Sequence, residues 1–349
     1  MSTTMEQLRE RTTVAVGRAP HGHVAYSASL DEVWVLNGGA RDITALDGTS
    51  GAKKRTIDVG AAPRHLIFDG GHAVAYVAVD DGLVIVDATS GQVSKRIPVR
   101  GRATCLLPML PRQRMYVLTD TGGMTAVDTA QGAAVGVIAT GRGSAWGQRH
   151  ENTCGKLYVA NAATDDQTVI DEATETVLAT VKVGRRPERN AIFREQGLVY
   201  TANRADDTVT AVSIETDSVV ATVAAGPYPF RLIGMKKKTG RADLWVLDRG
   251  TPGAKGAITV ISATEHRATG SIATMDHPCN WLFDGPTAQI VGSGTKDMLI
   301  VDGKAAAVVG TARLSEEPDP TSFSNMVFSK SGLLFLANAN DSVSVFGHA

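Results

Sequence analysis

The sequence has few cysteines, few aromatic residues, almost no net charge and no long apolar run. Its 349 residues include three cysteines, Cys105, Cys154 and Cys279, which are too few and too scattered for a disulfide framework or a structural zinc site. Lys and Arg number 35 against 36 Asp and Glu, which argues against nucleic-acid binding through bulk positive charge. No stretch approaches the ~20 apolar residues of a membrane-spanning helix, so no membrane partner is expected.

The first eleven residues, MSTTMEQLRER, contain no apolar stretch of the kind that secretory signals carry. Together with the low cysteine count, this predicts a cytoplasmic protein. Glycine is abundant, with 36 residues, while aromatic residues make up only 5%. That composition is typical of a β-protein with many tight turns.

Three short patterns recur along the chain. The first ends a strand with Asn, Asp or Ser and reads VWVLN at 33, LYVAN at 157, VYTAN at 199 and LFLAN at 334, with eight copies in all. The second follows each copy, as in DITALD at 42 and TVTAVS at 208. The third ends in glycine at Gly17, Gly60, Gly101, Gly141, Gly184 and Gly226, with spacings of 43, 41, 40, 43 and 42 residues. Alternating apolar residues with turn signals at this spacing predict four antiparallel strands per unit, which is one propeller blade.

The fold prediction is therefore all-β, a single β-propeller of eight four-stranded blades. Residues 12–17 match only the last strand of a unit, and residues 317–346 supply only the first three. We expect the N-terminal strand to complete the C-terminal blade and so close the ring. The predicted organisation is an N-terminal arm over 1–11 and a propeller over 12–349.

Two units, LYVANAATDDQTVIDEATETVLATVKVG and VYTANRADDTVTAVSIETDSVVATVAAG, closely resemble the YVTN-type β-propeller repeat. The resemblance extends over about residues 12–347, strongest in the fourth and fifth units. Proteins with this repeat commonly have seven blades, so seven is the alternative count. The wider group includes haem-binding propellers of the nitrite reductase type and lactonase-like enzymes such as 6-phosphogluconolactonase and muconate-cyclising enzymes. The resemblance implies a fold and, by analogy only, an activity, because one fold hosts many functions.

Binding residues are expected on the linkers between blades, which lie on one face of a propeller with the loops between second and third strands. Arginines gather in the first six linkers, and a guanidinium binds carboxylates and phosphates with two hydrogen bonds. Those that follow a linker proline and enter the innermost strand are the best candidates, whereas the arginines before the proline are interpreted as a solvated rim. The predicted substrate-binding residues are His21, Arg64, Arg189, Arg231, Trp146, Asn190, Phe230 and Trp281.

Four histidines occur in the same linkers, and imidazole serves as an acid, a base or a metal ligand near neutral pH. The predicted catalytic residues are His23, His65 and His277, with Glu188 as a partner carboxylate. No cofactor is predicted, and a divalent metal held by His21, His23 and His65 is the alternative. The ordinary interpretation is that these side chains only cap strand ends, and that the aromatic ones fill the interior.

The functional hypothesis is an enzyme that acts on a small anionic organic substrate, anchored by arginine, through histidine acid–base chemistry. Lactone hydrolysis, lyase chemistry and cyclisation all fit such a site. The alternatives are a non-catalytic propeller that binds a ligand or a protein partner, and a tetrapyrrole-binding propeller.

Overall fold

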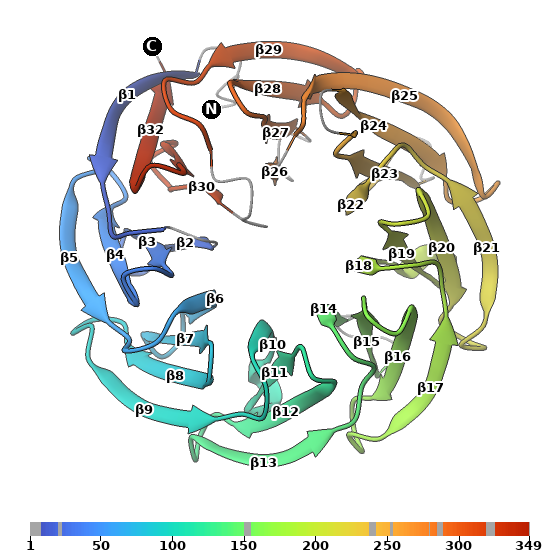
Figure 1. Cartoon of the computed structure of the whole chain (residues 1–349), viewed down its shortest axis with the longest axis horizontal. Coiled ribbons are helices and arrows are strands. Elements are labelled where there is room, and N and C mark those ends of the chain that lie inside the picture. The colour runs from blue at the N-terminus through green and yellow to red at the C-terminus, as the bar shows by residue number, and fades with distance from the viewer. Residues whose placement is uncertain are drawn as a thin grey trace. The chain divides into compact units, whose positions relative to one another are not determined.

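The computed structural model describes residues 8–19, 23–149, 155–236, 242–251, 254–278, 280–284, 289–318 and 325–348. They form eight antiparallel sheets of four strands each, and the protein is an all-β, eight-bladed β-propeller (Figure 1). The predicted fold class is confirmed, with eight blades rather than seven. No helix in the described part of the chain is long and apolar enough to cross a membrane.

The chain divides into two compact units. The first comprises Met1–Leu110, Ala130–Gly132 and Pro278–Ala349, and the second comprises Pro111–Thr129 and Ala133–His277. Blades one, two, seven and eight belong to the first unit, and blades four, five and six belong to the second. Blade three has its innermost strand in the first unit and its other three strands in the second.

The strands of the first unit follow the repeats read from the sequence. Blade one contains β2 (Val24–Ser27), β3 (Glu32–Asn37), β4 (Asp42–Asp47) and β5 (Lys53–Asp58). Blade two contains β6 (Pro63–Asp69), β7 (Val74–Val79), β8 (Gly82–Asp87) and β9 (Val93–Pro98), and β10 (Ala103–Met109) follows it. Blade seven contains β26 (Asn280–Asp284), β27 (Gln289–Ser293), β28 (Asp297–Asp302) and β29 (Ala307–Arg313). Blade eight contains β30 (Met326–Phe328), β31 (Leu334–Ala337), β32 (Ser342–His348) and β1 (Leu8–Ala15).

The second unit repeats the same arrangement. It begins after a 3-10 turn, η2 (Leu110–Arg112), with β11 (Arg114–Thr119), β12 (Gly123–Asp128) and β13 (Ala133–Ile138). Blade four contains β14 (Ser144–Arg149), β15 (Lys156–Asn161), β16 (Asp166–Asp171) and β17 (Val177–Lys182). Blade five contains β18 (Pro187–Phe193), the turn η3 (Arg194–Gln196), β19 (Leu198–Asn203), β20 (Thr208–Ser213) and β21 (Val219–Ala224). Blade six contains β22 (Pro229–Lys236), β23 (Ala242–Asp248), β24 (Lys255–Ser262) and β25 (Arg267–Asp276).

Blade eight is built from both ends of the chain, as the sequence predicted. Its strand order is β1-β32-β31-β30, and β1 pairs antiparallel with β32 from Leu8↔His348 to Ala15↔Ser342 (Figure 1). The strand begins at Leu8, so its first residues lie within the segment 1–11 predicted as an arm.

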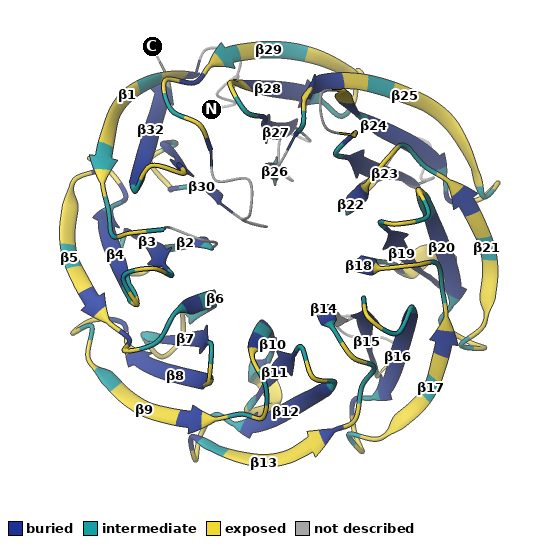
Figure 2. Cartoon of the chain, in the orientation of Figure 1, coloured by how far each residue is buried: buried dark blue, intermediate teal, exposed yellow. Residues whose placement is uncertain are grey.

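The second and third strands of each blade are buried on both faces, and the fourth is exposed (Figure 2). All six residues of β3 are buried, whereas β5 buries only Ile57 and leaves lysines in solvent. Apolar residues of neighbouring sheets meet between the blades: in blades one and two these include Trp34, Leu36, Val77 and Val84. Because the second and third strands are covered on both faces, they carry continuous apolar runs. The fourth strand is exposed and carries charged residues.

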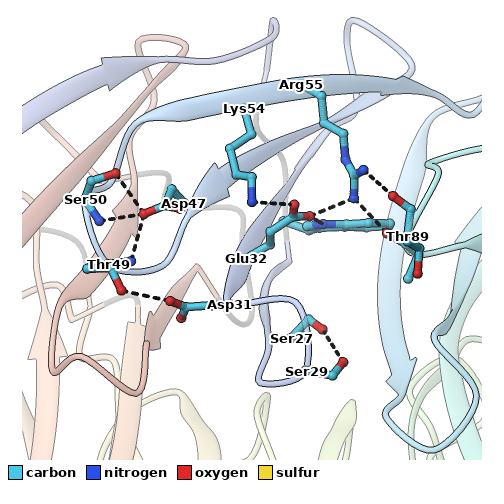
Figure 3. Close-up of polar contacts among 12 residues, drawn as sticks. Ser27, Ser29, Asp31, Glu32, Asp47, Thr49, Ser50, Lys54, Arg55 and Thr89 are labelled. Carbon is cyan, nitrogen blue, oxygen red and sulfur yellow. Dashed lines mark hydrogen bonds and ion pairs between the residues drawn. The ribbon is translucent and has the colours of Figure 1, made fainter.

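Hydrogen bonds within turns and side chains that cross between blades connect neighbouring parts of the repeats. The carboxylate of Asp47 accepts hydrogen bonds from the amide and hydroxyl of Ser50, and these bonds lower the pKa of that carboxyl (Figure 3). Buried Glu32 binds the guanidinium of Arg55, which also donates to the carbonyl oxygens of Ala88 and Thr89 in blade two. The aspartates that end third strands are therefore structural, as their place before turn residues indicated.

Candidate functional site

The linkers between blades have a recurring backbone conformation that fixes the loops beside them. A linker glycine lies against the Asn or Asp that ends the second strand: a Cβ at Gly184 would be 2.6 Å from Asn203. Two residues later the backbone is left-handed, with φ of +51° at Arg186 and +58° at Tyr228. The carbonyl of Arg186 accepts the N–H of Arg204, and that of Tyr228 accepts the N–H of Arg249. Each linker therefore positions the loop between the second and third strands of the blade that it enters.

The innermost strands of blades five and six carry Arg189 and Arg231, each two residues after the proline that begins its strand. β18 and β22 lie side by side in the second unit. Arg231 keeps some accessible surface, yet burial, together with the neighbouring Arg189 cation, lowers the pKa of its guanidinium to about 9. Two like charges held together with little water form a site suited to an anion.

Two more arginines lie just outside these strands, each over an aromatic ring. The guanidinium carbon of Arg204 is 5.1 Å from the ring centre of Tyr228, and that of Arg249 is 5.1 Å from the ring centre of Phe230. Arg204 also binds the carboxylate of Glu188. We refer to Arg189, Arg204, Arg231 and Arg249 as the arginine cluster.

His277 lies beside the arginine cluster, in the linker that leaves blade six, with a left-handed φ of +44°. Burial lowers the pKa of its imidazole, and the charges of Arg249 and Arg204 lower it further. The ring is therefore neutral at physiological pH. Among the described residues, its buried Nδ1 has no hydrogen-bond partner. The structure thus brings the predicted residues His277, Glu188, Arg189, Arg231 and Phe230 into one region.

Asn190 is also in this region, but its amide is used within the protein. Its oxygen accepts a hydrogen bond from Thr201, and its nitrogen donates to the carbonyl of Tyr158 in blade four. Gln167 donates to the same Thr201 hydroxyl, which makes a buried chain of polar groups between two blades. These contacts indicate a structural role for Asn190, beside its predicted role in substrate binding.

The first unit contains a second group of predicted residues, centred on His23 and His65. Their rings stack with centroids 4.3 Å apart. The N–H of Leu66 donates to Nδ1 of His23 at 3.1 Å, and the N–H of Leu106 donates to Nδ1 of His65 at 3.2 Å. Because each Nδ1 accepts a proton donor, the neutral imidazoles carry their own proton on Nε2. The pair is therefore arranged for hydrogen-bond donation through Nε2.

Two other predicted residues of the first unit have partners or packing of their own. Arg64 donates from Nε to Asp80 at 2.7 Å, so its charge is balanced within blade two. Trp281 is 2% exposed, and its ring lies so close to Gly292 that a Cβ there would overlap it. That contact indicates packing inside blade seven.

His21 lies outside the described residues. Trp146 lies in β14, but its side chain is not described. Within the described ranges no three His, Cys, Asp or Glu side chains converge as a metal site would require. The proposed trio of His21, His23 and His65 is untested, because it includes His21. The hydrogen bonds of the other two favour the Nε2–H form, which is not the form that coordinates a metal through Nε2.

Sequence reasoning missed Arg204, Arg249 and Tyr228. The available signal was positional: arginine directly follows the Asn or Asp that ends the second strand in the fifth and sixth repeats only. Arg204 and Arg249 lie in loops between second and third strands, whereas all the predicted site residues lie in the linkers and the innermost strands.

Comparison with known proteins supports the fold and does not identify a family. No family profile matches the sequence, and no curated protein is similar to it. Solved structures do match. One is the dihydro-heme d1 dehydrogenase NirN in complex with DHE, with a TM-score of 0.74 and 15% identity over 97% of this chain and 76% of that one.

Two other matches have different origins. BamB from Moraxella catarrhalis has a TM-score of 0.72 and 14% identity, over 97% of this chain and 99% of its own. The computationally designed protein Ika8 has a TM-score of 0.72 and 12% identity, over 97% and 98%. At such identities the likeness extends to the propeller fold alone.

Proposed function

We propose that the protein binds a small organic anion through the arginine cluster of blades five and six. The observation that carries this proposal is the pair Arg189 and Arg231, two neighbouring guanidiniums on the innermost strands, where burial and the charge of Arg189 both disfavour the charge of Arg231. A carboxylate or phosphate would offset both the lost hydration and the mutual repulsion. Arg249 lies over Phe230 at the edge of the same region and adds positive charge there, whereas the charge of Arg204 is paired with Glu188.

Binding of the anion is expected to stabilise the folded protein. At a ligand concentration about a hundred times Kd, the free energy of unfolding rises by about 2.7 kcal/mol. Melting curves with citrate, pyrophosphate, cyclohexane tricarboxylate and trimesate measure this effect, each compared with sodium chloride at equal ionic strength. If none of the anions raises the melting temperature above the salt control, the proposed function is wrong.

Catalysis is the second candidate, and the position of His277 favours it. A neutral imidazole with an unpartnered Nδ1 beside arginines that anchor an anion has the properties of a general base. We expect lactone hydrolysis, lyase or cyclase activity to fall by at least a hundredfold in His277→Asn, while anion binding changes by less than about threefold. Proton release from a panel of lactones and sugar acids measures the activity. Turnover that is absent in the wild type, or unchanged in the variant, contradicts this candidate.

The tetrapyrrole and protein-partner alternatives have direct tests as well. NirN, a structural neighbour, is in complex with DHE, and a tetrapyrrole with acidic side chains would also use arginines. A haem titration followed by absorbance separates that ligand from the smaller anions. A protein partner that competes with trimesate would indicate a shared surface.

A further inference from the structure

Among the Phe, Tyr and Trp residues whose burial the structure describes, only Tyr228 is exposed. All six tyrosines are described: four are buried, Tyr26 is intermediate, and only Tyr228 is exposed, at 39%. It lies in the linker between blades five and six, directly beside the arginine cluster. Its exposure is not explained by packing.

The backbone of Tyr228 is also unfavourable for tyrosine. Its φ of +58° lies in the left-handed region, which glycine adopts without strain and other residues enter at a cost in energy. The equivalent linker residue is Gly143 in blade four, Ala19 in blade one and Arg186 in blade five, so the left-handed conformation belongs to the linker, and both small and large residues occupy it. Tyr228 differs from these residues in placing an exposed aromatic ring beside the arginine cluster, and such a ring offers a surface for stacking.

One face of the Tyr228 ring is covered and the side chain remains accessible. Arg204 lies over the ring, and its guanidinium is held in turn by Glu188. The side chain of Tyr228 is 39% exposed despite this contact, so part of it remains accessible to a ligand. A flat ring can stack there while acidic groups on the same molecule reach the guanidiniums.

We infer that the ligand of the arginine cluster is a planar aromatic acid, which stacks on Tyr228 while its carboxylates bind the arginines. This inference rests on the proposed function and adds a requirement for ring shape. An aliphatic acid of the same charge would make the ionic contacts and lose the stacking.

The test compares trimesate with cyclohexane tricarboxylate, which has the same charge and substitution on a saturated ring. Calorimetric titration of the wild type is expected to show about tenfold tighter binding of trimesate. Tyr228→Gly is expected to reduce that preference to less than about twofold and to leave the melting temperature unchanged or higher. Tyr228→Phe retains the ring and the preference. Arg186→Gly, one linker earlier, is the matched control and keeps the preference.

The outcomes separate the two proposals. Equal affinity of the two acids for the wild type, or a preference that persists in Tyr228→Gly, overturns the inference and leaves anion binding intact. No binding of either acid, together with no effect of citrate or pyrophosphate, overturns the proposed function and the inference with it.

Discussion

Arg231→Gln is expected to weaken binding of trimesate and citrate by about a hundredfold, because loss of a desolvated charge–charge contact costs on the order of 3 kcal/mol. The same change is expected to leave the free energy of unfolding equal or higher, since it removes the repulsion between Arg231 and Arg189. Calorimetric titration measures the affinity, and urea denaturation measures the stability. A variant that loses both would indicate a structural role instead.

The pH dependence of binding gives an independent check on Arg231. Its pKa is lowered to about 9, so its charge is lost as the pH rises through that value. Affinity of the wild type should therefore fall between about pH 8 and pH 10, and the affinity of Arg231→Gln should change much less over the same range. Arg185→Gln is the matched control: Arg185 is exposed and paired with Asp206, and its loss should change affinity by less than about twofold. An equal pH profile in the wild type and Arg231→Gln would count against the assignment.

Asp248→Asn is expected to stabilise the protein at about pH 8 by on the order of 4 kcal/mol. Asp248 is fully buried, and burial raises the pKa of its carboxyl to about 7. Asn37, Asn161, Asn203 and Asn338 take the equivalent place in other blades, where each amide donates to side-chain oxygens of the third strand. In blade six this hydrogen bond runs in the opposite direction, because the hydroxyl of Thr259 donates to Oδ2 of Asp248. The other carboxyl oxygen of Asp248, Oδ1, has no hydrogen-bond partner among the described residues.

The sign of the effect follows from the two pKa values. In the unfolded chain the carboxyl has its ordinary pKa of 3.8, so between that value and about 7 the folded state holds a proton that the unfolded state has lost. The contribution of Asp248 to stability is therefore greatest below about pH 4 and falls by roughly 1.4 kcal/mol per pH unit up to about pH 7. Asparagine carries no titrating proton, and Asp248→Asn should remove this slope.

Urea denaturation at several pH values measures the slope directly. Asn203→Asp is the reverse change at the same place in blade five and should introduce a loss of stability with rising pH. If the wild type and Asp248→Asn show the same slope between about pH 5 and pH 7, the carboxyl of Asp248 does not titrate in that range.

The eight blades were predictable from the sequence because the same residues recur at the same strand ends and turns of successive blades. The Asn that ends a second strand, the glycine that passes over it and the aspartate that caps a turn recur at fixed intervals, and each has a physical role in the structure. The pairing of the two ends was predictable because the terminal segments supplied complementary parts of one repeat.

The candidate site was less predictable, and β-bulges are one reason. Register shifts interrupt β6 between Pro63 and His65, β18 between Pro187 and Asn190, and β22 between Pro229 and Arg231. A bulge changes which side chains share a face, so alternation along the sequence does not tell whether Arg64 or Arg189 points inward. The hydrogen bond from Arg64 to Asp80 joins β6 to the residue that follows β7, and it depends on that geometry.

The pairing of β1 with β32 has a consequence for biosynthesis. During translation β1 leaves the ribosome long before its partner, while hairpins such as β3 with β4 can form as soon as they emerge. Until β32 has been synthesised, the edge of β1 is open to pairing with neighbouring nascent chains. The charges of Arg9 and Glu10 oppose such pairing. Completion of this blade therefore waits until β32 has been synthesised, and it depends on β1 staying available until then.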